Sequence, residues 1–189
     1  MKKNNGAVFL DRDGTINEEV GYLDSLGKLR IFPAAFDAVR MINESGMKVV
    51  VVTNQSGVAR GLFDEAFVKE LHEHIDTTFK SKGARIDRFY YCPHHPPEGI
   101  GRYVVSCSCR KPEPGMLLQA SEDLAIDLPA SYMVGDTARD IGSANRAGAT
   151  GILVKTGYGK EVAPSGIRAA YIAEDILDAA QWILGDRTR

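Results

Sequence analysis

Two acidic residues, two positions apart, follow a short apolar run near the start of the chain. The run is Ala7–Leu10, and the acidic stretch reads Asp11-Arg12-Asp13-Gly14-Thr15. An unbroken apolar run of this length predicts a buried strand. Two carboxylates at a poorly hydrated strand end repel each other, and a divalent cation such as Mg²⁺ would remove that cost. A polar turn with an N-capping aspartate is the simpler interpretation, so the pair needs support from elsewhere in the chain.

Later stretches place further polar residues at comparable positions. Thr53 follows the apolar run 49–52, Asp136 follows the predicted strand 131–135, and Lys111 lies in Cys109-Arg110-Lys111-Pro112. In an open α/β sheet, ligands bind beyond the carboxyl ends of the strands. The sequence therefore predicts that these loops converge on one crevice.

The converging residues would divide the work of phosphoryl transfer. A carboxylate can attack phosphorus, so Asp11 is the candidate nucleophile that forms an aspartyl-phosphate. Asp13 is the candidate general acid for the leaving alcohol, and then the general base for water. Thr53 and Lys111 would stabilise the charged oxygens of the transferring group. Mg²⁺ would be held by Asp11, the backbone carbonyl of Asp13, and Asp136.

Each of these residues also has an ordinary structural interpretation. Thr53 could end a strand, Lys111 could be a solvated charge, and Asp136 could be a helix N-cap. Asp140, one helical turn after Asp136, would steady the surroundings of the metal. Because the residues occur together and in this order, the joint pattern favours an active site.

All three cysteines lie in a segment rich in proline and glycine, residues 92–109. Cys92-Pro93-His94 and Cys107-Ser108-Cys109 form two ligand pairs, and three thiolates with one imidazole are a common structural Zn²⁺ set. The matching spacing favours His94, with His95 as a possible substitute. The alternative is three buried free cysteines and a surface histidine. We predict a closed zinc site that holds this loop rigid just before Arg110.

Strands and helices alternate along the whole chain, which predicts an α/β fold with a doubly wound, mostly parallel sheet. We expect a single domain over residues 1–189 with the zinc loop 92–109 as an insert, an irregular flap over 16–31, and no cap domain. His72 and His74, two apart on one predicted helix, are expected at the surface. The expected strands are 7–10, 47–53, 86–91, 131–135, 150–154 and 170–173, and the expected helices are 33–45, 64–82, one opened by Pro114, 138–147 and 174–184.

Composition narrows the class of protein. The chain has 189 residues and a formal net charge of −2 with no basic run, so it gives no electrostatic support for nucleic-acid binding. No apolar segment is long enough for a signal peptide or a membrane span. An odd number of cysteines, confined to one segment, favours metal binding in a reducing compartment. We expect a cytoplasmic monomer that acts on a small molecule.

Taken together, these motifs resemble the haloacid dehalogenase superfamily of phosphatases. The resemblance implies a Rossmann-like core and a Mg²⁺-dependent phosphomonoester hydrolase, and an aspartate at position 13 is what the phosphatase members carry. The stretches that carry the resemblance are Asp11 to Thr15, Thr53-Asn54, Lys111-Pro112, and Gly135-Asp136 through Asp140.

A capless chain with this zinc loop is similar, more closely, to the D-glycero-D-manno-heptose-1,7-bisphosphate 7-phosphatase family. That similarity implies removal of the C7 phosphate in the synthesis of nucleotide-activated heptose, for lipopolysaccharide or surface glycans. Arg110 also suits a bidentate grip on an anionic or hydroxyl-rich sugar. The substrate contacts that the family resemblance implies are Glu19, Val20, Gly21, Tyr22, Thr53, Asn54, Gln55, Ser56, Arg110 and Lys111.

Other interpretations stay open at this point. A histidinol-phosphate phosphatase would share the fold and a similar zinc loop, and the sequence separates the two only weakly. A phospho-accepting signalling domain is also doubly wound, but its acceptor normally follows a middle strand rather than the first. A zinc-stabilised interaction module would have no activity at all.

Overall fold

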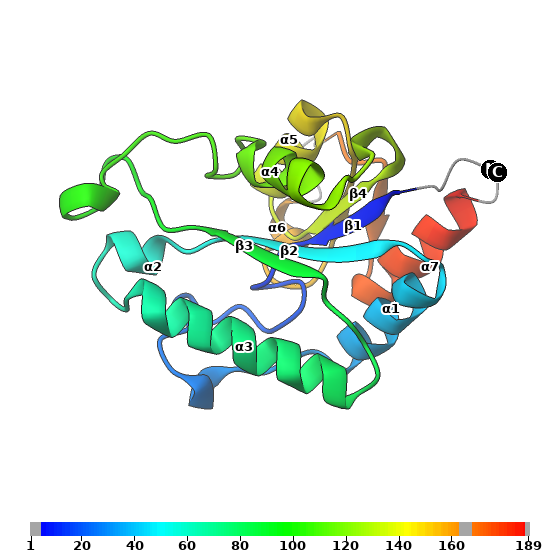
Figure 1. The fold of residues 1–189 in the computed structure, drawn as a ribbon, viewed down its shortest axis with the longest axis horizontal. Helices are drawn as coiled ribbons and strands as arrows, with labels where there is room; N and C mark the ends of the chain where they lie inside the picture. Colours follow the sequence, from blue (N-terminus) through cyan, green and yellow to red (C-terminus); the bar gives the residue numbers. More distant parts are fainter. Residues whose placement is uncertain (1–4, 163–167, 188–189) are drawn as a thin grey trace.

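The computed structural model describes residues 5–162 and 168–187, and these residues are built around a parallel sheet (Figure 1). The sheet has six strands in the order β3-β2-β1-β4-β5-β6, and every neighbouring pair is parallel. This order confirms the predicted doubly wound fold. The strands are β1 (Ala7–Leu10), β2 (Lys48–Asn54), β3 (Arg88–Cys92), β4 (Tyr132–Gly135), β5 (Thr150–Val154) and β6 (Tyr171–Ala173).

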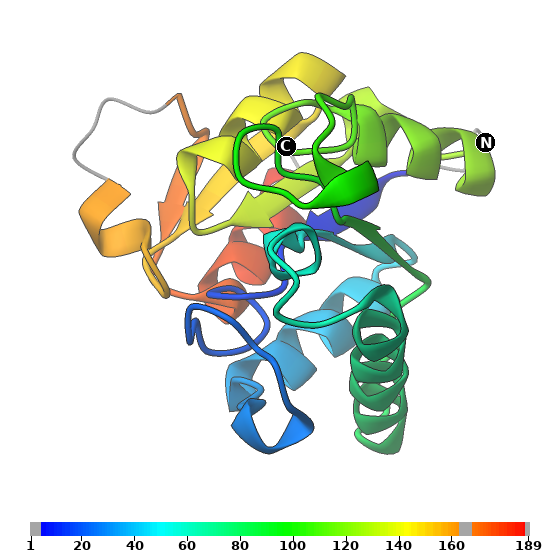
Figure 2. The same cartoon turned by 90° about the vertical axis from the view of Figure 1, so that its left-hand side faces the viewer.

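Helices cover both faces of the sheet (Figures 1 and 2). Side chains of α1 (Pro33–Glu44), α3 (Glu65–Ser81) and α7 (Ile176–Asp186) share one hydrophobic cluster, and those of α4 (Gly115–Leu124) and α5 (Ala138–Ala147) share the other. Successive side chains of a strand point to opposite faces. In β1, therefore, Val8 and Leu10 enter the first cluster while Ala7 and Phe9 enter the second. Because both faces of the sheet are buried, the central strands appear in the sequence as continuous apolar runs.

The predicted element boundaries were wrong in a few places. β3 begins at Arg88 rather than at residue 86. Two helices of four residues were not predicted, α2 (Ser56–Ala59) and α6 (Gly159–Val162). A single helical turn is too short to show a hydrophobic period, so the sequence carries no pattern for it.

His72 corrects a second expectation. His74 is exposed as predicted, but His72 is buried on α3, with its ring stacked on Phe89 at a centroid distance of 4.8 Å. It lies one helical turn after Val68, which is also buried, so the two share the inner face of the helix. The polar ring is tolerated there because its Nε2 lies 3.4 Å from Nη1 of Arg12.

Two irregular segments lie near the carboxyl ends of the strands. The only helical part of residues 16–31 is a 3₁₀ turn at Leu26–Lys28, and the only helical part of residues 93–109 is one at Gly101–Tyr103. In the described residues, both irregular segments connect elements of the single sheet core. Within the same residues, no helix combines the length and the apolar character that crossing a membrane requires.

Candidate active site

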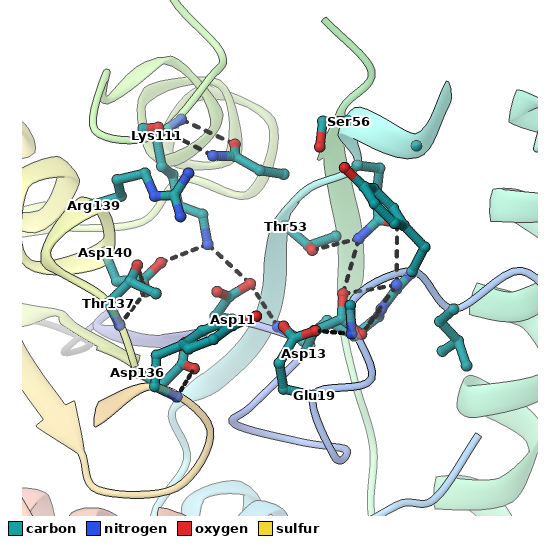
Figure 3. A pocket seen from close by; sticks show the side chains of 18 of the residues that line it. Asp11, Asp13, Glu19, Thr53, Ser56, Lys111, Asp136, Thr137, Arg139 and Asp140 are labelled. Carbon is teal, nitrogen blue, oxygen red and sulfur yellow. Dashed lines mark hydrogen bonds and ion pairs between the residues drawn. The ribbon is translucent and has the colours of Figure 1, made fainter. Parts of the chain in front are cut away.

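The candidate site lies beyond the centre of the sheet, where β1 and β4 are neighbours and the strand order reverses. Asp11 follows β1 directly and its backbone N–H donates to the carbonyl of Val134 at 2.9 Å, while Asp136 follows β4. The predicted convergence is therefore found (Figure 3). One cavity of about 180 Å³ is lined by Asp11, Asp13, Thr53, Lys111 and Asp136, among others.

Lys111 is a buried cation that contacts two carboxylates of the site. Its Nζ lies 2.9 Å from Oδ1 of Asp11 and 2.6 Å from Oδ1 of Asp140, and it donates to the carbonyl of Val52 at 2.8 Å. Burial alone would lower the pKa of Lys111, but the carboxylates of Asp11 and Asp140 outweigh it and raise that pKa. The backbone of Lys111 is fixed by Asn54, whose side-chain amide exchanges two hydrogen bonds of 3.0 Å with it. The lysine is therefore charged and held in one place.

Three carboxylates gather around this one lysine. Ligand oxygens of Asp11, Asp136 and Asp140 all lie within 4.8 Å of one another. Burial raises the pKa of Asp136 to about 7, and Asp140 adds to the effect. Burial and the charge of Asp140 also raise the pKa of Asp11, with Lys111 offsetting part of the shift. An excess of buried negative charge on oxygen ligands is the environment that a Mg²⁺ ion fits.

Asp140 links Lys111 to the start of α5. Its Oδ2 accepts hydrogen bonds from the backbone N–H and the hydroxyl of Thr137, at 3.0 and 2.6 Å. Thr137 is the N-cap of α5, so the carboxylate fixes the first turn of the helix as well as Lys111. The contribution of the Asp13 backbone carbonyl to metal binding stays a prediction.

Two glycines enclose the Asp136 carboxylate. A Cβ atom added to Gly14 or to Gly157 would collide with Oδ2 of Asp136, and both residues have positive φ, +77° and +55°. The same oxygen accepts a hydrogen bond from the backbone N–H of Tyr158 at 2.9 Å. Gly14 belongs to the acidic stretch that follows β1, but Gly157 lies more than 140 residues after Gly14, so no local pattern indicated its role.

Asp13 lies at the centre of a network of hydrogen-bond donors. Arg12, itself buried, donates through Nε at 3.2 Å and through Nη2 at 2.8 Å. Asn17 Nδ2 and Gln55 Nε2 donate at 2.9 and 3.1 Å. Although burial acts in the opposite sense, Arg12 and these amides lower the pKa of Asp13. Sequence reasoning missed Arg12, Asn17 and His72 here; the only signal was an arginine between two aspartates in a buried stretch.

The predicted substrate contacts mostly border the cavity. Val20 is the exception, since its exposed side chain is absent from the cavity lining. Gln55 lines the cavity, but its amide is already bonded to Asp13 and to the Thr53 hydroxyl at 2.8 Å. Lining residues that were not predicted are Arg12, Leu23, Gly57, Phe63, Thr137, Arg139 and Tyr158, while the predicted residues that do line it are Glu19, Gly21, Tyr22, Thr53, Asn54, Gln55, Ser56, Arg110 and Lys111.

The cysteine and histidine side chains of the loop form a second cluster. The Sγ atom of Cys92 lies 3.5 Å from that of Cys107 and 3.0 Å from that of Cys109, and the two latter atoms are 3.2 Å apart. Nδ1 of His94 lies 3.7 Å from Sγ of Cys92. Ligands about 2.3 Å from a tetrahedral zinc would be roughly 3.8 Å apart. The donor set and its nearly tetrahedral size fit Zn²⁺, and His94 rather than His95 completes the cluster.

Arg110 connects this cluster to the cavity. It follows Cys109 directly, and its Nη1 donates to the backbone carbonyl of His94 at 3.1 Å. Arg110 and Lys111 both line the cavity. The loop that carries the four candidate zinc ligands therefore positions one of the cations at the mouth of the site.

The chain is similar to known proteins over almost its whole length. Residues 108–179 match a family model described as HAD-hydrolase-like. The chain is 45% identical over 165 residues to the D-glycero-beta-D-manno-heptose-1,7-bisphosphate 7-phosphatase of Yersinia pestis, a match that covers 87% of each protein. It is 43% identical over 185 residues to the enzyme of the same name from Escherichia coli (strain K12), covering 97% of this chain and 96% of that one.

A solved structure agrees with these relatives. The D,D-heptose 1,7-bisphosphate phosphatase from B. bronchiseptica, complexed with magnesium and phosphate, superposes with a TM-score of 0.86 at 32% identity, over 96% of this chain and 99% of that one. Fold, site geometry and whole-length sequence identity thus agree. The chain is a HAD-type phosphatase and belongs to the family of the D-glycero-beta-D-manno-heptose-1,7-bisphosphate 7-phosphatases.

Proposed function

We propose that this enzyme removes the C7 phosphate of D-glycero-β-D-manno-heptose 1,7-bisphosphate, in the synthesis of nucleotide-activated heptose for lipopolysaccharide or another surface glycan. The whole-length relatives support this substrate and the β anomer, since their names specify both. The observation that carries the reaction type is the buried Lys111 held between Asp11 and Asp140. Every proposed catalytic group comes from one chain, which is consistent with a single catalytic domain that acts as a monomer.

Asp11 is the proposed nucleophile. Its Oδ1 is oriented by Lys111 and by the backbone N–H of Arg12, at 2.9 and 2.7 Å. Within the described part of the chain, no donor is recorded for Oδ2, which is left to attack phosphorus. The bond between phosphorus and the C7 oxygen breaks as the bond between phosphorus and Oδ2 forms. The Thr53 hydroxyl and Lys111 stabilise the equatorial oxygens of the phosphoryl group.

Asp13 is the proposed proton carrier. It gives a proton to the departing C7 oxygen, then takes one from the water that attacks the phosphorus and releases inorganic phosphate and free Asp11. Arg12 and the amides of Asn17 and Gln55 favour its ionised form, which suits the second step directly. The first step needs the protonated form, and the negative charge of an arriving phosphate ester favours proton uptake nearby.

Both predicted metals fit residues of this chain. Asp11 and Asp136, with the backbone carbonyl of Asp13, would hold Mg²⁺, and Cys92, His94, Cys107 and Cys109 would hold Zn²⁺. Bound Mg²⁺ would screen the repulsion between Asp11 and the phosphate and polarise a phosphoryl oxygen. With four protein ligands the zinc is closed to substrate, so its role would be structural.

Phosphate release across a panel of substrates tests this proposal. The panel contains heptose 1,7-bisphosphate in both anomers, heptose 7-phosphate, histidinol phosphate and fructose 1,6-bisphosphate, each assayed with Mg²⁺. We expect the highest kcat/KM with the β-heptose bisphosphate. A preference for histidinol phosphate would contradict the substrate assignment and favour the rival phosphatase.

The variant Asp11→Asn serves as the catalytic control on the same panel. It keeps the shape of the side chain but removes the attacking charge, so turnover should fall by about 10³-fold or more. Residual turnover close to that of the unchanged protein would exclude Asp11 as the nucleophile. A phosphoenzyme that persists for minutes in Mg²⁺ would instead favour a signalling role.

A further inference from the structure

Two arginines from different parts of the chain meet at one side of the cavity mouth. Arg110 follows the zinc loop, and Arg139 lies in the first turn of α5. Both line the catalytic cavity, and both also line an adjoining shallow hollow, to which Pro96, Ser108 and Glu113 contribute. In Figure 3 the side chain of Arg139 extends into the site beside Lys111 and above Asp140.

Neither arginine forms an ion pair with a carboxylate of the described residues. Among the residues that the structure describes, no carboxylate pairs with Arg139, and Arg110 donates only to the carbonyl of His94. Glu113, the carboxylate of the hollow, is already paired with Arg146 at 2.5 Å. Arg110 is half-buried and Arg139 is exposed, and because both line the same cavity and the same hollow, their positive charges lie close together. Two guanidinium groups that repel each other without a carboxylate between them provide a binding site for an anion.

The opposite rim of the cavity has the opposite charge. A third hollow there is lined by Glu18, Glu19 and Glu161, together with Tyr158. The carboxylate of Asp13 also acts on Glu19, so several acidic groups are concentrated on that rim. An anionic group leaving the cavity is repelled on the glutamate side and attracted on the arginine side. Hydroxyl groups of a sugar, by contrast, can donate to the glutamates.

The size of the cavity requires the substrate to extend beyond it. Its volume is about 180 Å³, whereas pockets that enclose a whole small ligand usually measure about 300–1,000 Å³. Part of a seven-carbon sugar carrying two phosphates therefore lies outside. The hollow that shares Arg110, Lys111 and Arg139 with the cavity is the adjoining space of matching charge.

We propose that Arg139, acting with Arg110, binds the second phosphate group of the substrate, the one that is not transferred. The inference rests on the proposed function, because it supposes a substrate with two phosphates. Arg139 is in this sense a specificity-determining residue: it contacts the anion at the far end of the sugar rather than the reacting phosphorus. Guanidinium groups suit this role because they bind phosphate through two parallel hydrogen bonds.

The test compares matched substrates with one and two phosphates. Heptose 1,7-bisphosphate and heptose 7-phosphate are assayed with the unchanged enzyme, with Arg139→Gln and with Arg139→Lys. We expect Arg139→Gln to lower kcat/KM for the bisphosphate about tenfold or more, chiefly through KM, and to change the monophosphate less than about twofold. Arg139→Lys should restore part of the loss, because it keeps the charge without the bidentate geometry.

Arg88→Gln is the matched control, since it removes the same charge from an exposed residue at the other end of a strand. It should leave both substrates unaffected. An equal loss on both substrates with Arg139→Gln, or a loss on neither, would overturn the inference. Failure of the proposed function would show separately, as poor turnover of the heptose bisphosphate by the unchanged enzyme. In that case, fructose 1,6-bisphosphate and fructose 6-phosphate provide the matched pair of substrates with two phosphates and one.

Discussion

The protein contains two clusters of candidate metal ligands, and they are built in different ways. The carboxylates of Asp11, Asp136 and Asp140 stand at the ends of β1 and β4 and at the start of α5, where the sheet fixes their backbones. In the other cluster, only Cys92 belongs to a strand, and His94, Cys107 and Cys109 lie on a loop with little secondary structure. The first cluster is therefore held by the fold, whereas the second must itself hold the loop.

The two clusters also differ in how their negative charge is balanced. In the carboxylate cluster, Lys111 provides a permanent counter-charge that limits the repulsion. In the described structure, the cysteine cluster has no comparable buried cation within hydrogen-bond distance, and thiolates gathered this closely need an ion to be stable. We therefore expect loss of Mg²⁺ to stop the chemistry but spare the fold, whereas loss of Zn²⁺ should first disturb the local structure of the loop.

The largest expected effect concerns chemistry without structural change. Asp13→Asn keeps the size and shape of the side chain but removes its ability to accept and donate a proton in catalysis. We therefore expect kcat to fall by about 10²–10⁴-fold. Mg²⁺ affinity, measured by isothermal titration calorimetry, should change little because the proposed ligand is the backbone carbonyl. A large loss of Mg²⁺ binding would contradict that backbone role and the separation between chemistry and metal binding.

Loss of the zinc site should have an intermediate effect. In Cys109→Ser, we expect zinc content by atomic absorption to collapse and kcat/KM to fall about tenfold, because Arg110 is no longer held in place. Limited proteolysis should then cut within residues 93–109 while the sheet stays intact. Ser108→Ala, between two candidate ligands, is the matched control and should keep its zinc. Unchanged kinetics in a verified zinc-free sample would show that the loop does not position Arg110.

The smallest expected effect is on thermal stability. Without Mg²⁺, the pKa of Asp136 is about 7 in the folded state against an ordinary value of 3.8. The folded protein then binds a proton that the unfolded chain releases, so this contribution to stability is complete below about pH 4 and is lost as the pH rises through 7. Mg²⁺ would take the place of the proton. The gain in Tm on adding Mg²⁺ should therefore be larger at pH 8 than at pH 5, and the two gains should differ by about 5 °C.

Differential scanning fluorimetry with EDTA or with Mg²⁺ measures this difference. Asp136→Asn is the control, since it removes the titrating group and should make the response to Mg²⁺ small at both pH values. An equal gain in Tm at pH 5 and pH 8 in the unchanged protein would contradict the raised pKa of Asp136.

The sequence could reveal the candidate catalytic pair because the pattern that points to it is local. Asp11 and Asp13 adjoin a strand that is apolar throughout, and Cys92 and His94 have the spacing of a ligand pair. The strands themselves were predictable because both faces of the sheet are buried. For the same reason, short helices such as α2 and α6 were missed, since a single turn has no apolar period to detect.

The sequence by itself determined which groups are candidates for catalysis and metal binding: the carboxylates, the lysine, the thiolates and their order along the chain. The tertiary structure alone decided what surrounds them. His72 lies against Arg12, Gly157 lies against Asp136, and Arg139 lies beside Lys111, although each pair is separated by tens of residues or more. The physical reason is the strand order, which brings β1 beside β4 and so joins loops whose side-chain contacts have no period or spacing in the sequence.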